Sequence, residues 1–186
     1  MAEKELQRWQ AGAPGRQLAI IRPSVVFGPN ENGNYTRLFR QLRRNLFVYM
    51  GRKDTLKSSV YVKDLVRFLL WLNSSPISDR RSPIYNFALP HPLTIQTICE
   101  SICAEFGFRK PGLVVPFKLA LLGGYLGELA NVIGLRNPVH HRRIEKLYHS
   151  THIAPDRALR EGFTFDYPLP QALADWRAAC HGKELA

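Results

Sequence analysis

The chain has 186 residues, 45% of them hydrophobic, and carries 26 Lys and Arg against 15 Asp and Glu, a net charge of +11. This length and composition build one sizeable core, or a smaller core with an appended lobe, which excludes disorder as the default. The charge favours anionic partners. Because the basic residues are spread along the chain without an RNA-binding motif, we expect no nucleic acid partner.

The cysteine content indicates the cellular compartment, and the longest apolar stretch indicates whether the chain enters a membrane. Cys99, Cys103 and Cys180 are too few for a disulfide framework and fit a reducing cytoplasm. The first ten residues carry mixed charge and no apolar core, which excludes an ordinary signal peptide. The stretch from Phe117 to Leu135 approaches the length of a membrane span but contains charged residues and four glycines. We interpret it as a buried or amphipathic helix and expect no membrane partner, with a membrane-associated helix as the minor alternative.

The chain opens on a helical pattern over Met1 to Gln10 that lacks an N-cap residue. It is stopped by Ala11-Gly12-Ala13-Pro14-Gly15. So short a helix, starting at an initiator Met, is marginal unless it packs on something. We therefore expect the sequence to begin part-way through this helix.

A strand and a polar loop follow. The apolar run from Leu18 to Ile21 predicts a strand buried on both faces, as in a parallel sheet covered by helices. Arg22 and Pro23 are expected to end it, because proline cannot donate to a strand ladder. Ser24 to Phe27 then leads into turn formers between Gly28 and Asn34. Ligands bind outside the carboxyl ends of strands in open α/β sheets, so this loop is a candidate site, with an ordinary exit turn as an equal alternative.

Hydrophobic periodicity and turn residues predict the remaining elements. Helices are expected over 35–44, 64–73, 94–106, 117–135, 138–149, 156–161 and 169–180, and strands over 46–50, 58–62, 83–89 and 113–115. Asp64 is assigned to capping of its own helix, and Thr94 and Gly107 to the two ends of the next one. Strands alternate with helices only in the first half, which predicts an α/β fold with a separate helix-rich lobe.

Five segments stand in a recognisable order: Ala2-Glu3, IIRPSVVFGPNENGN, SSVYVKDLVRFLL, PIYNFA with Thr94, and DRALREGFTF. This order resembles the C-terminal half of an extended short-chain dehydrogenase/reductase of the NAD-dependent epimerase/dehydratase family, which modifies nucleotide-sugars. The resemblance implies an α/β fold made of the C-terminal part of a Rossmann-type parallel sheet plus a helix-rich substrate-binding lobe. Residues 1–90 would be a remnant of the dinucleotide-binding domain with a substrate-lobe insertion near 34–57, and residues 91–186 the mainly helical substrate-binding lobe.

The resemblance also implies a cofactor, NAD or NADP, and a nucleotide-sugar substrate. In the family, the strand that matches Leu18 to Ile21 is followed by a loop that passes the nicotinamide end of the cofactor. Pro23, Ser24 and Val25 are therefore expected to contact the cofactor through their backbones. Asn34, with the helix after it, is expected to face the substrate.

Basic residues are expected, by the same resemblance, at the diphosphate of the substrate. Lys57 stands where relatives often have an Arg, and a lysine offers a point charge in place of a planar fork. Arg142 or Arg143 matches a second basic position that often reaches the same phosphates. We expect no metal ligands, because His149 and His152 have helical spacing but no Cys or carboxylate joins them at ligand spacing.

Two motifs of the family are missing from the 186 residues. No Gly-rich loop that would cradle a pyrophosphate follows a strand, and no Tyr-x-x-x-Lys lies on a helix, since Tyr49 and Lys53 have that spacing across a turn. In the family that Tyr moves the proton while NAD exchanges the hydride. Its helix commonly continues into an Ala-Glu pair such as Ala2-Glu3. We therefore expect no catalytic residue here and no activity of this chain alone, whereas the complete form would transiently oxidise or reduce a nucleotide-sugar.

Two other functions stay open. A non-catalytic module for a nucleotide diphosphate or another anion would use Lys57 with Arg142 or Arg143. A basic nucleic-acid-binding protein is the weaker alternative. The complete form could also be a homodimer.

Overall fold

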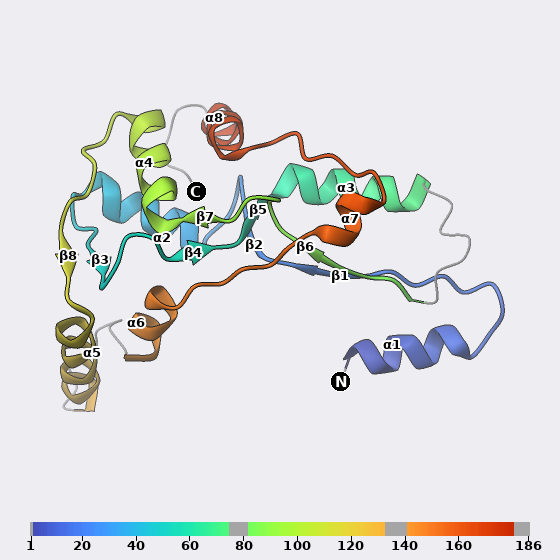
Figure 1. Ribbon diagram of the computed structural model, residues 1–186, viewed down its shortest axis with the longest axis horizontal. Helices are drawn as coiled ribbons and strands as arrows, with labels where there is room; N and C mark the ends of the chain where they lie inside the picture. Colours follow the sequence, from blue (N-terminus) through green and yellow to red (C-terminus); the bar gives the residue numbers. More distant parts are fainter. Residues whose placement is uncertain (1, 75–81, 133–140, 181–186) are drawn as a thin grey trace.

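The computed structural model describes residues 2–74, 82–132 and 141–180 (Figure 1). Its helices are α1 (Ala2–Ala11), α2 (Asn34–Arg43), α3 (Val62–Ser74), α4 (Ile95–Phe106), α5 (Phe117–Val132), α6 (His141–Tyr148), α7 (Asp156–Arg160) and α8 (Leu169–Ala179). Its strands are β1 (Ile20–Pro23), β2 (Val25–Phe27), β3 (Tyr49–Met50), β4 (Leu56–Lys57), β5 (Ser59–Tyr61), β6 (Ile84–Phe87), β7 (Leu93–Thr94) and β8 (Val114–Val115). All the predicted helices and strands are present, with shifted ends. Residues 133–135 and 138–140 of two predicted helices lie outside the described ranges.

Parallel pairing organises the first half of the chain. β1 pairs with β6 and β2 pairs with β5, all in parallel. Only Ser24 separates β1 from β2, and its backbone N–H donates to the carbonyl of Phe87 at 2.8 Å, so the two strands form one bent strand with two partners. Helix α3 connects β5 to β6, which makes a βαβ unit of the kind that parallel pairing requires. The α/β expectation is confirmed.

The first strand differs from the prediction in two ways. It runs through Pro23, because the bond at that end of the ladder is donated by Ser24 and not by the proline. It is also buried less than predicted: Ile20 is buried, Ile21 is half-buried, and Arg22 and Pro23 are exposed. Among the described residues no strand pairs with the other edge of β1, and this leaves one side of it open.

Helix α1 lies at one end of the molecule, with α5 and α6 at the other (Figure 1). None of its residues is buried, and Leu6 and Trp9 are about half exposed. Two hydrogen bonds of 2.8 and 2.5 Å join Arg22 of β1 to the carboxylate of Glu3. An exposed ion pair with two hydrogen bonds therefore joins α1 to β1, whereas no residue of α1 is buried.

Two apolar clusters form the core. The larger is centred on the aromatic rings of β2, α2 and α8 and includes Phe27, Tyr35, Phe39, Tyr49, Tyr61, Ile98, Ile102, Leu173 and Trp176. The smaller packs α3 and β6 on the segment after α7 and includes Val60, Phe68, Leu72, Tyr85, Phe87, Ala158 and Phe163. Each cluster joins residues from before and after position 90, so the C-terminal segment stabilises the parallel strands.

Helix α4 begins and ends as its sequence predicts. The hydroxyl of Thr94 accepts a hydrogen bond from the backbone N–H of Thr97 at 3.0 Å, which satisfies one of the free N–H groups of the first turn. Gly107 closes the helix in the left-handed conformation with φ of 71°. Both end assignments are confirmed.

Candidate functional site

The candidate site begins where β1 passes into β2. Pro23 and Val25 are exposed, and Ser24 between them is half-buried. The Ser24 hydroxyl oxygen is itself buried and has no hydrogen-bond partner in the described part of the chain. A buried hydroxyl without a partner costs about 1–3 kcal/mol, so this corner offers a group that a bound ligand could satisfy.

The loop after β2 is held at Gly28 against the end of β5 and the start of α3. This residue has φ of +148°, and a Cβ atom placed on it would lie 2.5 Å from Cγ1 of Val62. Three residues on, the backbone N–H of Glu31 donates to the carbonyl of Gly28 at 3.1 Å. The loop therefore leaves β2 along one fixed path toward α2.

Glu31 also controls the N-terminus of α2. Its carboxylate accepts hydrogen bonds from the backbone N–H and the hydroxyl of Thr36 at 2.9 and 2.7 Å. A carboxylate there matches the positive end of the helix dipole. Asn34, the first residue of α2, is exposed beside it. An acidic group thus occupies this helix end, next to the exposed Asn34.

Lys57 binds the end of α6. Its ammonium group donates to the carbonyls of Lys146 and His149 at 2.7 and 2.8 Å, which are acceptors that a helix C-terminus leaves free. Burial lowers the pKa of Lys57. Lys57, which is predicted to contact the diphosphate, therefore uses two of its three N–H donors to hold the end of α6.

Neighbouring bonds strengthen the same junction. The backbone N–H of Leu56 donates to the hydroxyl of Ser150 at 3.0 Å, and the N–H of Thr151 returns a bond to the carbonyl of Leu56 at 2.9 Å. Helix α6 carries Arg142 and Arg143 in its first turn, where the structure describes their backbone only. The structure therefore places Lys57 and the two predicted arginines at opposite ends of one helix.

We expect Lys57→Met to loosen α6 without unfolding the core. The loss should be about 1–2 kcal/mol of unfolding free energy, because two charge-assisted bonds disappear from a partly exposed site. Hydrogen exchange should rise at the amides of α6 and of residues 149–151. Lys110→Met is the matched control, since that ammonium is exposed and lies 3.9 Å from its carboxylate partner, Glu100. Equal exchange in both variants would contradict the role of Lys57.

Sequence reasoning missed a polar cluster around Asp175. The Tyr61 hydroxyl donates to Asp175 Oδ2 at 2.5 Å and the Lys63 ammonium to Oδ1 at 2.7 Å. Burial and the bond to Asp175 raise the pKa of Tyr61. These two bonds tie α8 to the end of β5 and the start of α3. No local pattern could reveal partners more than a hundred residues apart.

No group of three or more His, Cys, Asp or Glu that could hold a metal ion occurs in residues 2–74, 82–132 and 141–180. Burial raises the pKa of the Cys99 thiol to about 12, which keeps it protonated.

The paired parallel strands, the helix that connects β5 to β6 and the loop at their carboxyl ends define a Rossmann-type α/β protein. Residues 1–88 match the model of the NAD dependent epimerase/dehydratase family. This match over residues 1–88, together with the curated relative described below, supports the family that the motif order predicts.

Curated and solved relatives agree with this assignment. The chain is 28% identical over 174 residues to N-acetyl-alpha-D-glucosaminyl-diphospho-ditrans,octacis-undecaprenol 4-epimerase of Escherichia coli O157:H7, a match that covers 92% of this chain and 52% of the relative. Two solved structures share its fold at 18% identity. Human epimerase family protein SDR39U1 (isoform 2) with NADPH has a TM-score of 0.65 over 94% of this chain and 54% of its own. MoeE5 in complex with UDP-glucose and NAD has a TM-score of 0.62 over 97% and 54%. The chain thus spans about half the length of these relatives.

Proposed function

We propose that this chain is the C-terminal part of a nicotinamide-dependent epimerase or dehydratase for a sugar carried on a diphosphate. The observation that carries the proposal is the β1–β2 corner, with its partnerless Ser24 hydroxyl, in a segment that matches the family. The curated relative is named for a diphospho-linked sugar, and one solved neighbour for UDP-glucose and NAD. Both names support a sugar diphosphate as the ligand.

The cofactor, NAD or NADP, would meet this chain at its nicotinamide end. The exposed residues Pro23 and Val25 and the buried hydroxyl of Ser24 lie on that side. When bound, the nicotinamide supplies hydride transfer. This chain's own residues would orient the ring and limit its access to water, and the pyrophosphate of the cofactor would rest on residues outside this sequence.

The substrate would lie between the loop before α2 and the start of α6. In our proposal Asn34 faces the sugar, Arg142 and Arg143 hold the diphosphate, and Lys57 acts through α6 by fixing where that helix ends. The division into residues 1–90 and 91–186 belongs to the same proposal, as does the cytoplasmic location.

Calorimetric titration of the 186-residue chain tests this proposal. We expect binding of UDP-N-acetylglucosamine, loss of at least half of the binding free energy in Arg142→Ala/Arg143→Ala, and no binding of NAD. The matched control is Arg8→Ala/Arg16→Ala, which removes two exposed arginines at the other end of the molecule. Equal sugar-diphosphate binding in both double variants, or none in the folded wild-type chain, would overturn the assignment.

A second candidate function rests on the motifs absent from the sequence. Neither the Gly-rich loop nor Tyr-x-x-x-Lys on a helix occurs in the 186 residues, and this favours a chain that binds a nucleotide diphosphate without converting it. Joining the chain to the N-terminal half of the Escherichia coli relative distinguishes the two. Conversion of a sugar diphosphate by that fusion favours the partial enzyme. Binding without conversion, in a fusion that binds NAD, favours the module.

A further inference from the structure

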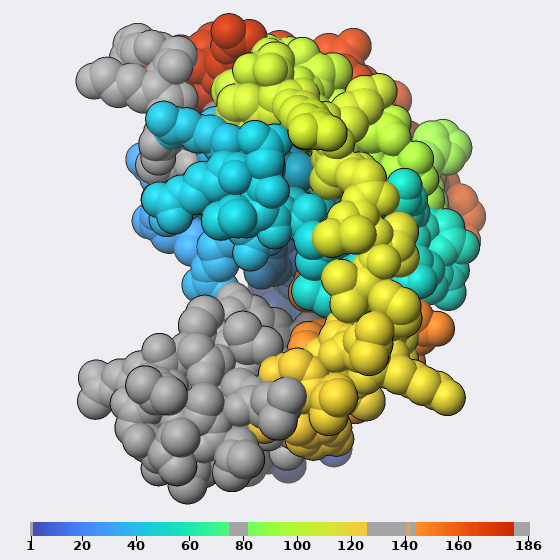
Figure 2. Space-filling view, turned by 90° about the vertical axis from the view of Figure 1, so that its left-hand side faces the viewer, coloured from blue at the N-terminus to red at the C-terminus, as the bar shows by residue number. Residues whose placement is uncertain are grey.

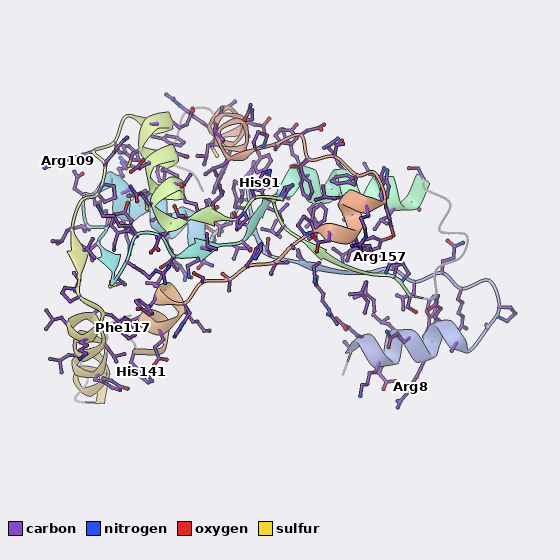
Figure 3. All side chains as sticks on the ribbon, in the orientation of Figure 1. Arg8, His91, Arg109, Phe117, His141 and Arg157 are labelled. Atoms are coloured by element: carbon purple, nitrogen blue, oxygen red, sulfur yellow. The ribbon has the colours of Figure 1, made fainter. Side chains whose placement is uncertain are left out.

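Helix α5 uses one of its faces to pack on α6. A Cβ atom on Gly124 would lie 2.8 Å from Cδ1 of Ile144 and 2.9 Å from the backbone of His141, so the helices touch here. Ala120, one turn earlier on the same face, is buried. The ring of Phe117 stacks on Tyr148 with centroids 4.1 Å apart. Figure 3 shows Phe117 and His141 together at this end of the molecule.

The opposite face of α5 is apolar as well and is exposed. Leu119 and Leu122 follow one another at a spacing of three, which sets them on one stripe, and they are 61% and 56% exposed. Tyr125, 50% exposed one step further on, stacks its ring on His141 of α6 with centroids 4.7 Å apart. A helix that is apolar on both sides is normally covered on both sides. Leu119 and Leu122, which we call the α5 stripe, are exposed in the described part of the chain.

Apolar and basic residues extend the α5 stripe toward the body of the molecule. Leu113 and Val114 lead into α5 and are also exposed. Figure 2 shows residues 109–122, in yellow, as one continuous ridge on this side. Lys118 is exposed on α5 itself, Arg109 and Lys110 are exposed where the ridge begins, and Lys146 is exposed on α6.

The sequence around the stripe has the same bias toward positive charge. Between residues 109 and 152, basic residues outnumber acidic ones by seven to two: Arg109, Lys110, Lys118, Arg136, Arg142, Arg143 and Lys146 against Glu128 and Glu145. Apolar side chains flanked by cations are typical of helices that lie in a membrane interface.

We infer that the α5 stripe docks on an anionic phospholipid surface. The two leucines would enter the boundary between headgroups and acyl chains. The cations would pair with lipid phosphates. The contact is interfacial, because no described helix is long and apolar enough to span a bilayer. This departs from the sequence-based expectation of no membrane partner.

Charge decides between a bilayer and a second copy of the chain. Two copies joined through this stripe would bring their cations face to face, which costs free energy, whereas a bilayer with acidic lipids neutralises them. The inference rests on the proposed function, since a sugar diphosphate anchored on a polyprenol would be presented at such a surface.

Vesicle co-sedimentation of the full 186-residue chain tests the inference. Partition onto vesicles with a 7:3 ratio of phosphatidylcholine to phosphatidylglycerol should exceed partition onto pure phosphatidylcholine and should fall with added salt. Leu119→Ser/Leu122→Ser should weaken partition about tenfold for each leucine removed from the boundary. Lys118→Glu/Lys146→Glu should weaken it at least fivefold per site, since each basic residue near an acidic surface contributes about that factor.

Leu69→Ser/Leu70→Ser on α3 is the matched control, because both leucines are exposed, at 49% and 65%, far from α5. Circular dichroism establishes that each variant is folded. Equal loss in both leucine pairs, partition that ignores lipid charge, or a dimer by light scattering that Leu119→Ser/Leu122→Ser dissolves would each overturn the inference. The assay contains no nucleotide or sugar, so its failure is distinguishable from failure of the calorimetric test.

Discussion

Replacing Asp64 with Ala is expected to remove about 3 kcal/mol of the unfolding free energy, because the backbone N–H groups that donate to it lose their acceptor. The Asp64 carboxylate is fully buried. It accepts hydrogen bonds from Arg67 at 2.9 Å and from the backbone N–H groups of Asp166 and Tyr167 at 3.1 and 3.2 Å. Without it, two backbone donors lose their acceptor and α3 separates from the C-terminal segment.

Asp166→Ala provides the matched control in the same network. Its carboxylate contacts the same guanidinium, Arg67, at 2.6 Å but is about half exposed. An exposed ion pair contributes at most about 1 kcal/mol, so this variant should change stability little. Urea titration followed by circular dichroism gives both free energies. Comparable losses in the two variants would show that the buried bonds of Asp64 do not carry the junction.

Asp64 also shows where sequence reasoning reaches its limit. An acidic residue in the first turn of a helix predicts capping, and Asp64 does lie in the first turn of α3. Its oxygens, however, bind backbone groups 102 and 103 residues further along the chain. A sequence reveals that an acceptor exists but not which distant donor folding brings to it.

Local signals were sufficient elsewhere. Thr94 and Gly107 mark the two ends of α4, and each acts on backbone groups within a few residues of itself. The capping residue and the group it caps therefore lie in the same short stretch of sequence. The strand predicted over residues 18–21 is present but runs from Ile20 to Pro23, and it is buried less than predicted, since burial depends on which elements lie beside it. For Lys57 too, the sequence shows the charge but not the two carbonyl groups at the end of α6 to which the ammonium group donates.

Gly28→Ala is the variant expected to affect both stability and the candidate site. A Cβ at residue 28 would lie 2.5 Å from Cγ1 of Val62 and 3.1 Å from Cε2 of Tyr61, and φ of +148° disfavours any L side chain. Backbone strain and overpacking together should cost about 3 kcal/mol. Because the Gly28 carbonyl holds Glu31, whose carboxylate fixes the start of α2, binding of UDP-N-acetylglucosamine should weaken as well.

Gly15→Ala separates the two causes. Gly15 also has a positive φ, +83°, but nothing lies within 4 Å of its Cβ position, so this variant should lose only about 1 kcal/mol from strain. Adding Val62→Ala to Gly28→Ala should restore part of the stability, since it removes the closest contact. If Gly28→Ala loses no more than Gly15→Ala, crowding against Val62 does not fix the loop. If the double variant regains stability but not sugar-diphosphate binding, the path of the loop toward Asn34 matters beyond its packing.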